Sequence, residues 1–181
     1  MKDLIDLKQT CEKLYRADHF SSKKKNSSDS PPLFELIYKT VDQLKVKADF
    51  SVSEVVFIKE GNLHVINDKK GTSLDFENNF FDACINVNAI YFWEHPITYF
   101  KEIYRVLRPG GVFSLAFKEK KCGGNLPWTQ PDFTFYDIRE VETFFMESGF
   151  ENIEVKQIAE ETLDKEMITP LINVFGQKKT V

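Results

Sequence analysis

The sequence FDACINVNAI at 81–90, followed by HPITYFKEIYRVLRPGG at 95–111 and VFSLAF at 112–117, decides the fold of this chain. The first and last segments are nearly continuous apolar runs, which is typical of parallel strands that are covered on both faces. Pro96 suits the first position of a helix. Pro109 and the two glycines after it end that helix in a sharp turn. Strand, helix and strand in this order predict a right-handed βαβ unit.

The helix of this unit has two distinct faces. Phe100, Ile103 and Val106 recur at helical spacing, so they are expected to form its buried stripe. Glu102 and Arg105 lie on the opposite side of the helical wheel and are expected to point to water.

A further helix and two strands are predicted after this unit. Asp137 and Glu140 have the spacing of a capping box, and Gly149 follows the helix that they begin. The stretches 152–159 and 171–176 have the composition of strands, and the segment between them is too short for a full helical crossover. They are therefore expected to form an antiparallel hairpin at an edge of the sheet.

The first 50 residues differ from the rest of the chain. Apolar residues at helical spacing predict helices over 2–17 and 33–45, and the polar segment SSKKKNSSDSPP at 21–32 is typical of a flexible linker. We therefore expect N-terminal helices with a linker in residues 1–50 and one α/β domain in residues 51–181.

The overall composition excludes several classes of function. A net charge of −4 gives no reason to expect nucleic acid as a partner. No apolar run is long enough to span a membrane, and the first residues lack the apolar core of a secretory signal. The three cysteines have no metal-binding spacing and are expected to be free thiols. We therefore predict a cytoplasmic protein without a metal site.

Two blocks of sequence resemble a known family. Leu74-Asp75-Phe76, followed by Phe80-Phe81-Asp82, and the later block EIYRVLRPGG at 102–111 are similar to motifs of the class I S-adenosylmethionine-dependent methyltransferases, in the branch that methylates small molecules. The similarity covers about residues 62–178. It implies a Rossmann-like sheet with an antiparallel last strand, S-adenosylmethionine as cofactor and methyl transfer to a small molecule.

The resemblance also implies a site. Ligands of open parallel sheets bind beyond the carboxyl ends of the strands, and the family places the methionine part of the cofactor after the strand that corresponds to 81–90. Asn86, Val87 and Asn88 would therefore contact the cofactor. Tyr91 and Trp93 would face the substrate, because aromatic rings attract cations. Core packing is an equally good reading of these two aromatic residues.

Two loops extend the implied site. Asp68, Thr72 and Ser73 lie where the family binds adenine, although Asp68 is two residues out of register with the family pattern. Trp128 lies in a loop that often contacts substrate in the family, and core or lid packing explains it equally well. No catalytic residue is expected, since methyl transfer needs alignment and a dry pocket more than a strong base.

The glycine-rich loop that opens the family's cofactor site has no counterpart. The first glycine is Gly61, and residues 59–62 are too short to connect two parallel strands. The strand at 54–58 must therefore turn back antiparallel on 63–66 or leave the sheet. The fold is thus expected to be truncated in its first half, with an exposed sheet edge that favours a homodimer. A non-catalytic remnant that serves as an interaction, regulatory or ligand-binding module is the alternative function.

Overall fold

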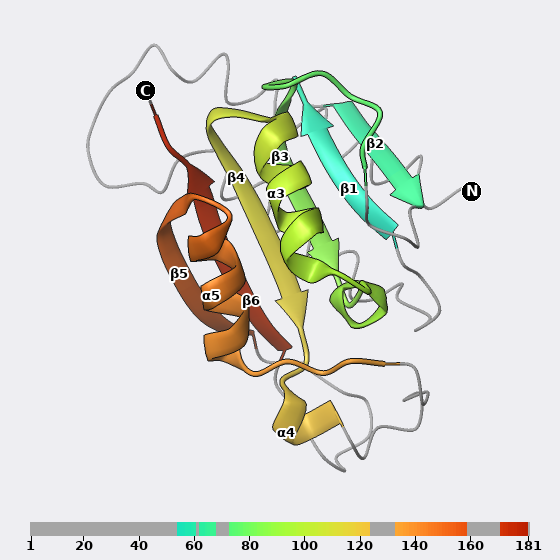
Figure 1. Ribbon diagram of the computed structural model, residues 1–181, viewed down its shortest axis with the longest axis vertical. Coiled ribbons are helices and arrows are strands. Elements are labelled where there is room, and N and C mark those ends of the chain that lie inside the picture. The colour runs from blue at the N-terminus through green and yellow to red at the C-terminus, as the bar shows by residue number, and fades with distance from the viewer. Residues whose placement is uncertain (1–53, 61, 68–72, 124–132, 159–170, 181) are drawn as a thin grey trace.

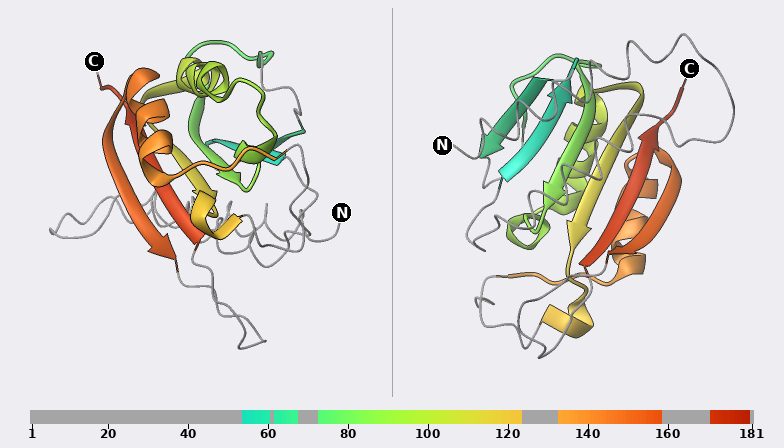
Figure 2. Two further views of the ribbon diagram at one scale, coloured as in Figure 1. Left: turned by 60° about the horizontal axis from the view of Figure 1, so that its bottom comes forward. Right: turned by 180° about the vertical axis from the view of Figure 1, so that it is seen from behind.

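The computed structural model describes residues 54–60, 62–67, 73–123, 133–158 and 171–180 (Figure 1). In this part of the chain, six strands form one sheet in the order β2-β1-β3-β4-β6-β5. The helices α3 (Pro96–Val106) and α5 (Ile138–Glu147) lie on the same face of the sheet (Figures 1 and 2). The predicted α/β class is confirmed. The predicted helices at 2–17 and 33–45 and the linker at 21–32 lie outside the described residues.

The central βαβ unit forms as the sequence predicts. Strands β3 (Phe81–Val87) and β4 (Leu107–Phe117) are parallel neighbours, and α3 connects them. Pro96 is the first residue of α3. The helix ends at Val106, and β4 begins directly after it. The sharp turn predicted at 109–111 is instead part of β4, where the register with β3 shifts between Phe81 and Ala83. Gly110 adopts a φ of 77° there, a conformation that glycine accepts readily.

The first two strands form an antiparallel hairpin. Strand β1 (Glu54–Lys59) pairs with β2 (Asn62–Asn67), and Lys59 lies opposite Asn62. Strand β1 also pairs antiparallel with β3. Glu60 in the turn has a φ of 49°, the left-handed conformation that tight hairpins require. Of the two arrangements that the sequence allows, the structure therefore has the antiparallel one, with β1 reversed relative to β3 and β4.

The C-terminal part matches the prediction closely. Helix α5 begins with a capping box, in which Asp137 Oδ1 accepts from Glu140 N at 2.9 Å and Glu140 Oε2 accepts from Asp137 N at 2.8 Å. Strands β5 (Phe150–Ile158) and β6 (Leu171–Lys178) are antiparallel, and β6 inserts between β4 and β5. The predicted edge hairpin is confirmed.

Aromatic side chains dominate the core between the sheet and the helices. Phe100 of α3 lies at the centre, with its ring 5.1 Å from that of Phe113 and 5.0 Å from that of Phe145. The other face of the sheet also carries buried apolar side chains, among them Val56 and Ile85. Both faces of the sheet are therefore buried, as the apolar runs at 81–90 and 112–117 predict.

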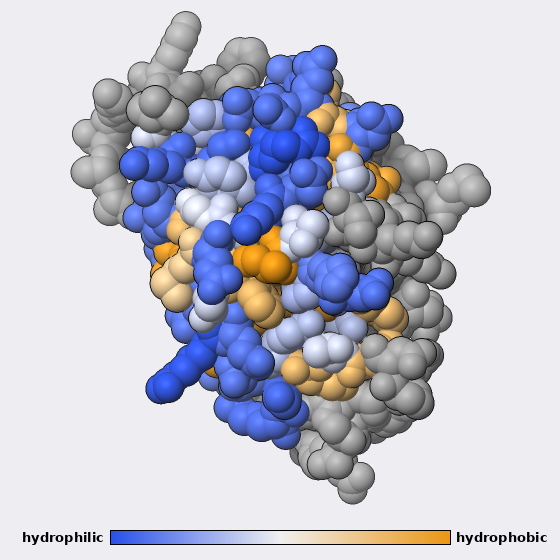
Figure 3. All heavy atoms as spheres, in the orientation of Figure 1, coloured by the Kyte–Doolittle hydropathy of each residue, from blue (hydrophilic) through white to orange (hydrophobic). Residues whose placement is uncertain are grey.

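Two short helical segments complete the described elements. A 3₁₀ turn, η1 (Ile90–Phe92), follows β3, and α4 (Lys120–Gly123) follows β4. Figure 3 shows that hydrophilic residues cover much of the described surface on the side of α3 and α5, where apolar colour appears in separate small patches.

Candidate functional site

The candidate site lies where the parallel strands β3 and β4 end. Val87 of β3 is level with Ala116 of β4, and the backbone N–H of Asn88 donates to the carbonyl oxygen of Ala116 at 2.9 Å. Asn88 has a φ of 59°, so the chain turns sharply as it leaves β3. Val55, near the start of β1, lies opposite Asn86. The carboxyl ends of two strands and the amino end of a third therefore meet at this edge.

The predicted cofactor residues take different positions here. Asn86 is fully buried, and its Oδ1 accepts from the backbone N–H of Ala89 at 3.3 Å, so its side chain closes the turn after β3. Val87 and Asn88 are half-buried at the strand end, whereas Ser73 is exposed. Asp68 and Thr72 lie outside the described residues.

Tyr91 is held in place by its surroundings. Only 1% of it is exposed, and its hydroxyl accepts from the backbone N–H of Lys118 and lies 3.3 Å from Asn88 Oδ1. Its ring stacks against Phe133 at 6.0 Å between centroids and contacts Phe135 at 4.9 Å. The side chain thus connects the ends of β3 and β4 to the segment after α4, and its packing fits the structural reading of this residue.

Trp93 is buried in the helical core. It is 2% exposed, and its ring centroid lies 4.5 Å from that of Tyr99 and 5.9 Å from that of Phe100. Its indole Nε1 is buried without a hydrogen-bond partner among the residues that the structure describes. Trp128, the third residue predicted to contact substrate, lies outside the described residues.

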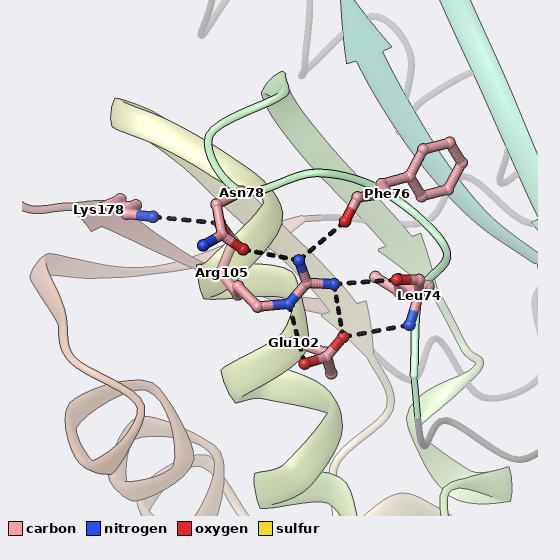
Figure 4. Close-up of polar contacts among 6 residues, drawn as sticks. All are labelled: Leu74, Phe76, Asn78, Glu102, Arg105 and Lys178. Atoms are coloured by element: carbon pink, nitrogen blue, oxygen red, sulfur yellow. Dashed lines mark hydrogen bonds and ion pairs between the residues drawn. The ribbon is translucent and has the colours of Figure 1, made fainter.

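Glu102 and Arg105 do not simply point to water, and their side chains hold the segment before β3 against α3 (Figure 4). Arg105 Nη2 donates to Leu74 O at 2.9 Å, and Nη1 donates to Phe76 O and to Asn78 Oδ1 at 2.8 Å each. Glu102 Oε2 accepts from Leu74 N at 3.1 Å and pairs with Arg105 Nη2 at 2.9 Å. We call this set the Arg105 clamp. Periodicity predicted solvent because it ignores where a neighbouring loop passes.

The clamp shifts the pKa values of Glu102 and Arg105. The hydrogen bond from Arg105, followed in effect by that from the Leu74 N–H, lowers the pKa of Glu102 despite its partial burial. The same pair raises the pKa of Arg105. Both side chains therefore stay charged over a wider pH range than they would in water.

Asp82 performs a similar task at the start of β3. Its buried carboxylate accepts from the backbone N–H of Glu60 at 2.6 Å and pairs with Arg108 at 3.0 Å. Gly111 passes close by, and a Cβ at this position would lie 3.0 Å from the carbonyl oxygen of Asp82 and 2.8 Å from that of Arg108. The two sequence blocks that carry the family resemblance, 74–82 and 102–111, are therefore in direct contact.

Lys178 fastens β6 to the end of α3. Its Nζ donates to the carbonyl oxygen of Tyr104 at 2.7 Å and to Asn79 Oδ1 at 2.9 Å (Figure 4 shows its contact with Arg105). Burial, with the nearby Arg105 charge, lowers the pKa of Lys178. The family motifs and the last strand thus support one end of α3, while the candidate site lies at the other end.

Two further findings bear on function. Within the described residues, no cluster of three or more His, Cys, Asp or Glu side chains could hold a metal ion. None of the described helices is long and apolar enough to cross a membrane.

Comparison with known sequences gives one family. Residues 32–115 match the family model described as a methyltransferase domain. The uncharacterized methyltransferase YdaC of Bacillus subtilis is 28% identical over 78 residues, which are 43% of this chain and 40% of that protein. The biotin biosynthesis bifunctional protein BioHC of Teredinibacter turnerae is 43% identical over 44 residues, which are 24% of this chain and 8% of that protein. The match thus spans less than half of each curated relative.

Comparison with solved structures gives the same fold. A S-adenosylmethionine-dependent methyltransferase of Thermotoga maritima aligns with a TM-score of 0.50 and 20% identity, over 60% of this chain and 61% of the other. A methyltransferase solved in complex with the Haloferax volcanii Trm112 methyltransferase activator aligns with a TM-score of 0.53 and 19% identity, over 61% and 59%. By its sequence match at 32–115 this chain is similar to methyltransferase domains, and its sheet has the fold of these solved methyltransferases.

Proposed function

We propose that this chain is a methyltransferase domain that binds S-adenosylmethionine at the carboxyl ends of β3 and β4 and methylates a small molecule. The parallel pair β3–β4, followed by the sharp turn at Asn88, carries the proposal. Open α/β sheets bind ligands beyond such strand ends. The match to a methyltransferase domain supports the chemistry, and Asn86, Val87 and Asn88 are proposed to contact the methionine part of the cofactor.

The described residues fit the half of the cofactor site that the family builds on these strands. Asn88 is half-buried and offers an amide at the strand end. The buried Nε1–H of Trp93 is a donor without a partner among the described residues. Among the described residues the other half has no counterpart, because β1 runs antiparallel to β3 and Lys59 leads into the hairpin turn at the opposite end of the sheet. Asp68, Thr72 and Ser73 remain the proposed contacts to adenine.

The chain's residues would act on the reaction by position. S-adenosylmethionine supplies a methyl carbon that its sulfonium already activates, so alignment and exclusion of water matter most. Tyr91 and Trp93 are fixed by packing, which would give the pocket a rigid aromatic wall. Trp128 is proposed to face the substrate from the segment after α4.

Binding of the product S-adenosylhomocysteine tests this proposal without any knowledge of the methyl acceptor. A ligand at 100 times its dissociation constant adds about 2.7 kcal/mol to the free energy of unfolding, which raises the melting temperature by several degrees. We expect this shift for the wild type. No shift at millimolar concentrations of either S-adenosylhomocysteine or S-adenosylmethionine would sink the proposal.

Two asparagines offer a matched pair of variants. Asn88 and Asn152 both have left-handed backbones, with φ of 59° and 53°, so alanine causes similar backbone strain at each. Asn88→Ala should weaken the binding of S-adenosylhomocysteine about tenfold, the loss of one good contact. Asn152→Ala, in β5, should bind as the wild type does. Equal affinities in calorimetry would remove Asn88 from the site.

A specific observation favours a second function. Within the described part of the chain, β1 runs antiparallel to β3, so no described strand ends where the family's glycine loop would follow. This supports a non-catalytic methyltransferase-like module with an interaction, regulatory or ligand-binding role. The absence of a thermal shift would favour this second function, whereas a shift would show that the cofactor binds and would leave turnover to be measured by methyl transfer.

The setting of the protein is also proposed from its sequence. A net charge of −4 supports partners other than nucleic acid, and the cysteines without metal-binding spacing support a cytoplasmic protein. The open first half of the sheet supports a homodimer through a sheet edge.

A further inference from the structure

The sheet ends in two edge strands, β2 and β5, and the two differ in how well they are guarded. Natural proteins block edge pairing with charges and bulges. Strand β5 has both, because its register shifts between Glu151 and Glu154, and Glu154 and Lys156 form an exposed ion pair at 3.4 Å. Asn152 within the bulge also has a φ of 53°. The outer edge of β5 is therefore a poor template for another strand.

Strand β2 lacks these guards. Its sequence, NLHVIN, contains no charged residue and no proline, and its six residues pair with β1 in an unbroken register. No described strand lies beyond it. Its side chain Val65 is 36% exposed, one of the few large apolar side chains in the described residues that reach solvent to this extent. A regular, uncharged edge of this kind accepts an added strand.

The turn geometry shows which backbone groups of β2 are free for such pairing. In a two-residue hairpin turn the carbonyl before the turn accepts from the N–H after it, so Asn62, opposite Lys59, points its N–H to β1. Backbone groups alternate in direction along an antiparallel strand. Leu63, Val65 and Asn67 therefore direct their N–H and C=O groups outward.

We propose that a second copy of this chain pairs antiparallel with β2, about a two-fold axis at Val65. This names the interface of the homodimer proposed above and rests on it. The axis runs perpendicular to the sheet, so each face of one sheet continues into the same face of the other. The two Val65 residues then exchange backbone hydrogen bonds, and Leu63 pairs with Asn67 on both sides, which gives about six bonds in total.

A second copy suits this edge because the strand is complementary to itself. The pairing opposes no charge to a like charge, since β2 has none. It also brings the two exposed Val65 side chains together and removes both from water.

A matched pair of variants tests the proposal in the full chain. Val65→Lys places a charge at the centre of the β2 edge, and Val155→Lys places the same charge on β5, where Val155 is 37% exposed. Sedimentation equilibrium over a range of concentrations measures the dimer dissociation constant of each. We expect the wild type and Val155→Lys to dimerise equally, and Val65→Lys to dissociate at least ten times more readily.

A second variant separates loss of pairing from loss of folding. Val65→Pro removes only the outward N–H, because the N–H of Val65 does not point to β1, so β2 should still pair with β1. Circular dichroism should show a folded protein, and sedimentation a monomer.

Each failure has a distinct meaning. A wild type that is monomeric at all concentrations overturns the homodimer and with it this interface. A dimer that survives Val65→Lys and Val65→Pro but not Val155→Lys moves the interface to β5 and leaves the homodimer standing. None of these outcomes depends on cofactor binding, so the proposed activity is judged separately.

Discussion

At the scale of single residues, the family motifs of this chain act through contact with its own backbone. Arg105 and Glu102 bind the Leu74–Asn78 segment, and Asp82 binds the turn of the β1–β2 hairpin. All of these groups are charged side chains that hold backbone N–H or C=O groups. The motif E-x-x-R therefore positions a loop, and the chemistry of the candidate site lies elsewhere.

The Arg105 clamp predicts a pH dependence of stability. Glu102 has a pKa below its ordinary value of 4.5 in the folded state, mainly through its hydrogen bond with Arg105. Its contribution is therefore fully present above the unfolded pKa and disappears as pH falls through the folded pKa. Glu102→Gln should lower the free energy of unfolding by about 1–2 kcal/mol at neutral pH. As pH falls through the lowered folded pKa of Glu102, the two proteins should converge.

Urea unfolding between neutral and acid pH measures this difference. Glu142→Gln, on α5 and outside the clamp, is the control and should follow the wild type throughout. If the free energy of unfolding of Glu102→Gln stays below that of the wild type by the same amount at all pH values, lost packing is responsible and not the carboxylate charge.

At the scale of elements, the reversed hairpin depends on one buried carboxylate. Asp82 is 4% exposed and joins the β1–β2 turn to the start of β3 through the N–H of Glu60. Asp82→Ala leaves that N–H without its partner, which should cost about 1–3 kcal/mol. Urea unfolding should show this loss, while Asp75→Ala, at an exposed position before β3, should stay within about 0.5 kcal/mol of the wild type.

The helix α5 contrasts with this hairpin in what local sequence specifies. Its start at Ile138 follows from Asp137 and Glu140, which satisfy each other's backbone N–H groups within one turn. Such a contact needs no other part of the molecule, so sequence spacing alone predicts it. The β1–β2 hairpin instead needs Asp82, which lies 22 residues from Glu60.

At the scale of the whole molecule, strand order predicts local stability. Strands β1, β3, β4 and β6 have a strand on each side, whereas β2 and β5 lie at the edges. Local opening is easiest at elements with few neighbours. Amide hydrogen exchange at low protein concentration should therefore be slowest in β4 and β6 and faster in β2 and β5. Equal protection of β2 and β4 in a monomer would contradict this strand order.

The sequence by itself determined the βαβ unit, the capped helix α5 and the C-terminal hairpin, and it indicated the similarity to methyltransferase domains. Each of these depends on local spacing or on an apolar run that a buried strand requires, as in Phe81–Val87 and in Asp137–Glu140. The short connection at 59–62 also limited β1 to two arrangements.

Tertiary structure alone decided the rest. It selected the antiparallel arrangement of β1, buried Asn86 and Tyr91 at the strand ends and Trp93 against α3, and turned Glu102 and Arg105 from solvent-facing residues into a clamp. The physical reason is that these outcomes depend on which distant backbone groups come within hydrogen-bond reach. Periodicity records the environment of one element along its own axis, and it carries no information about the segment that packs beside it.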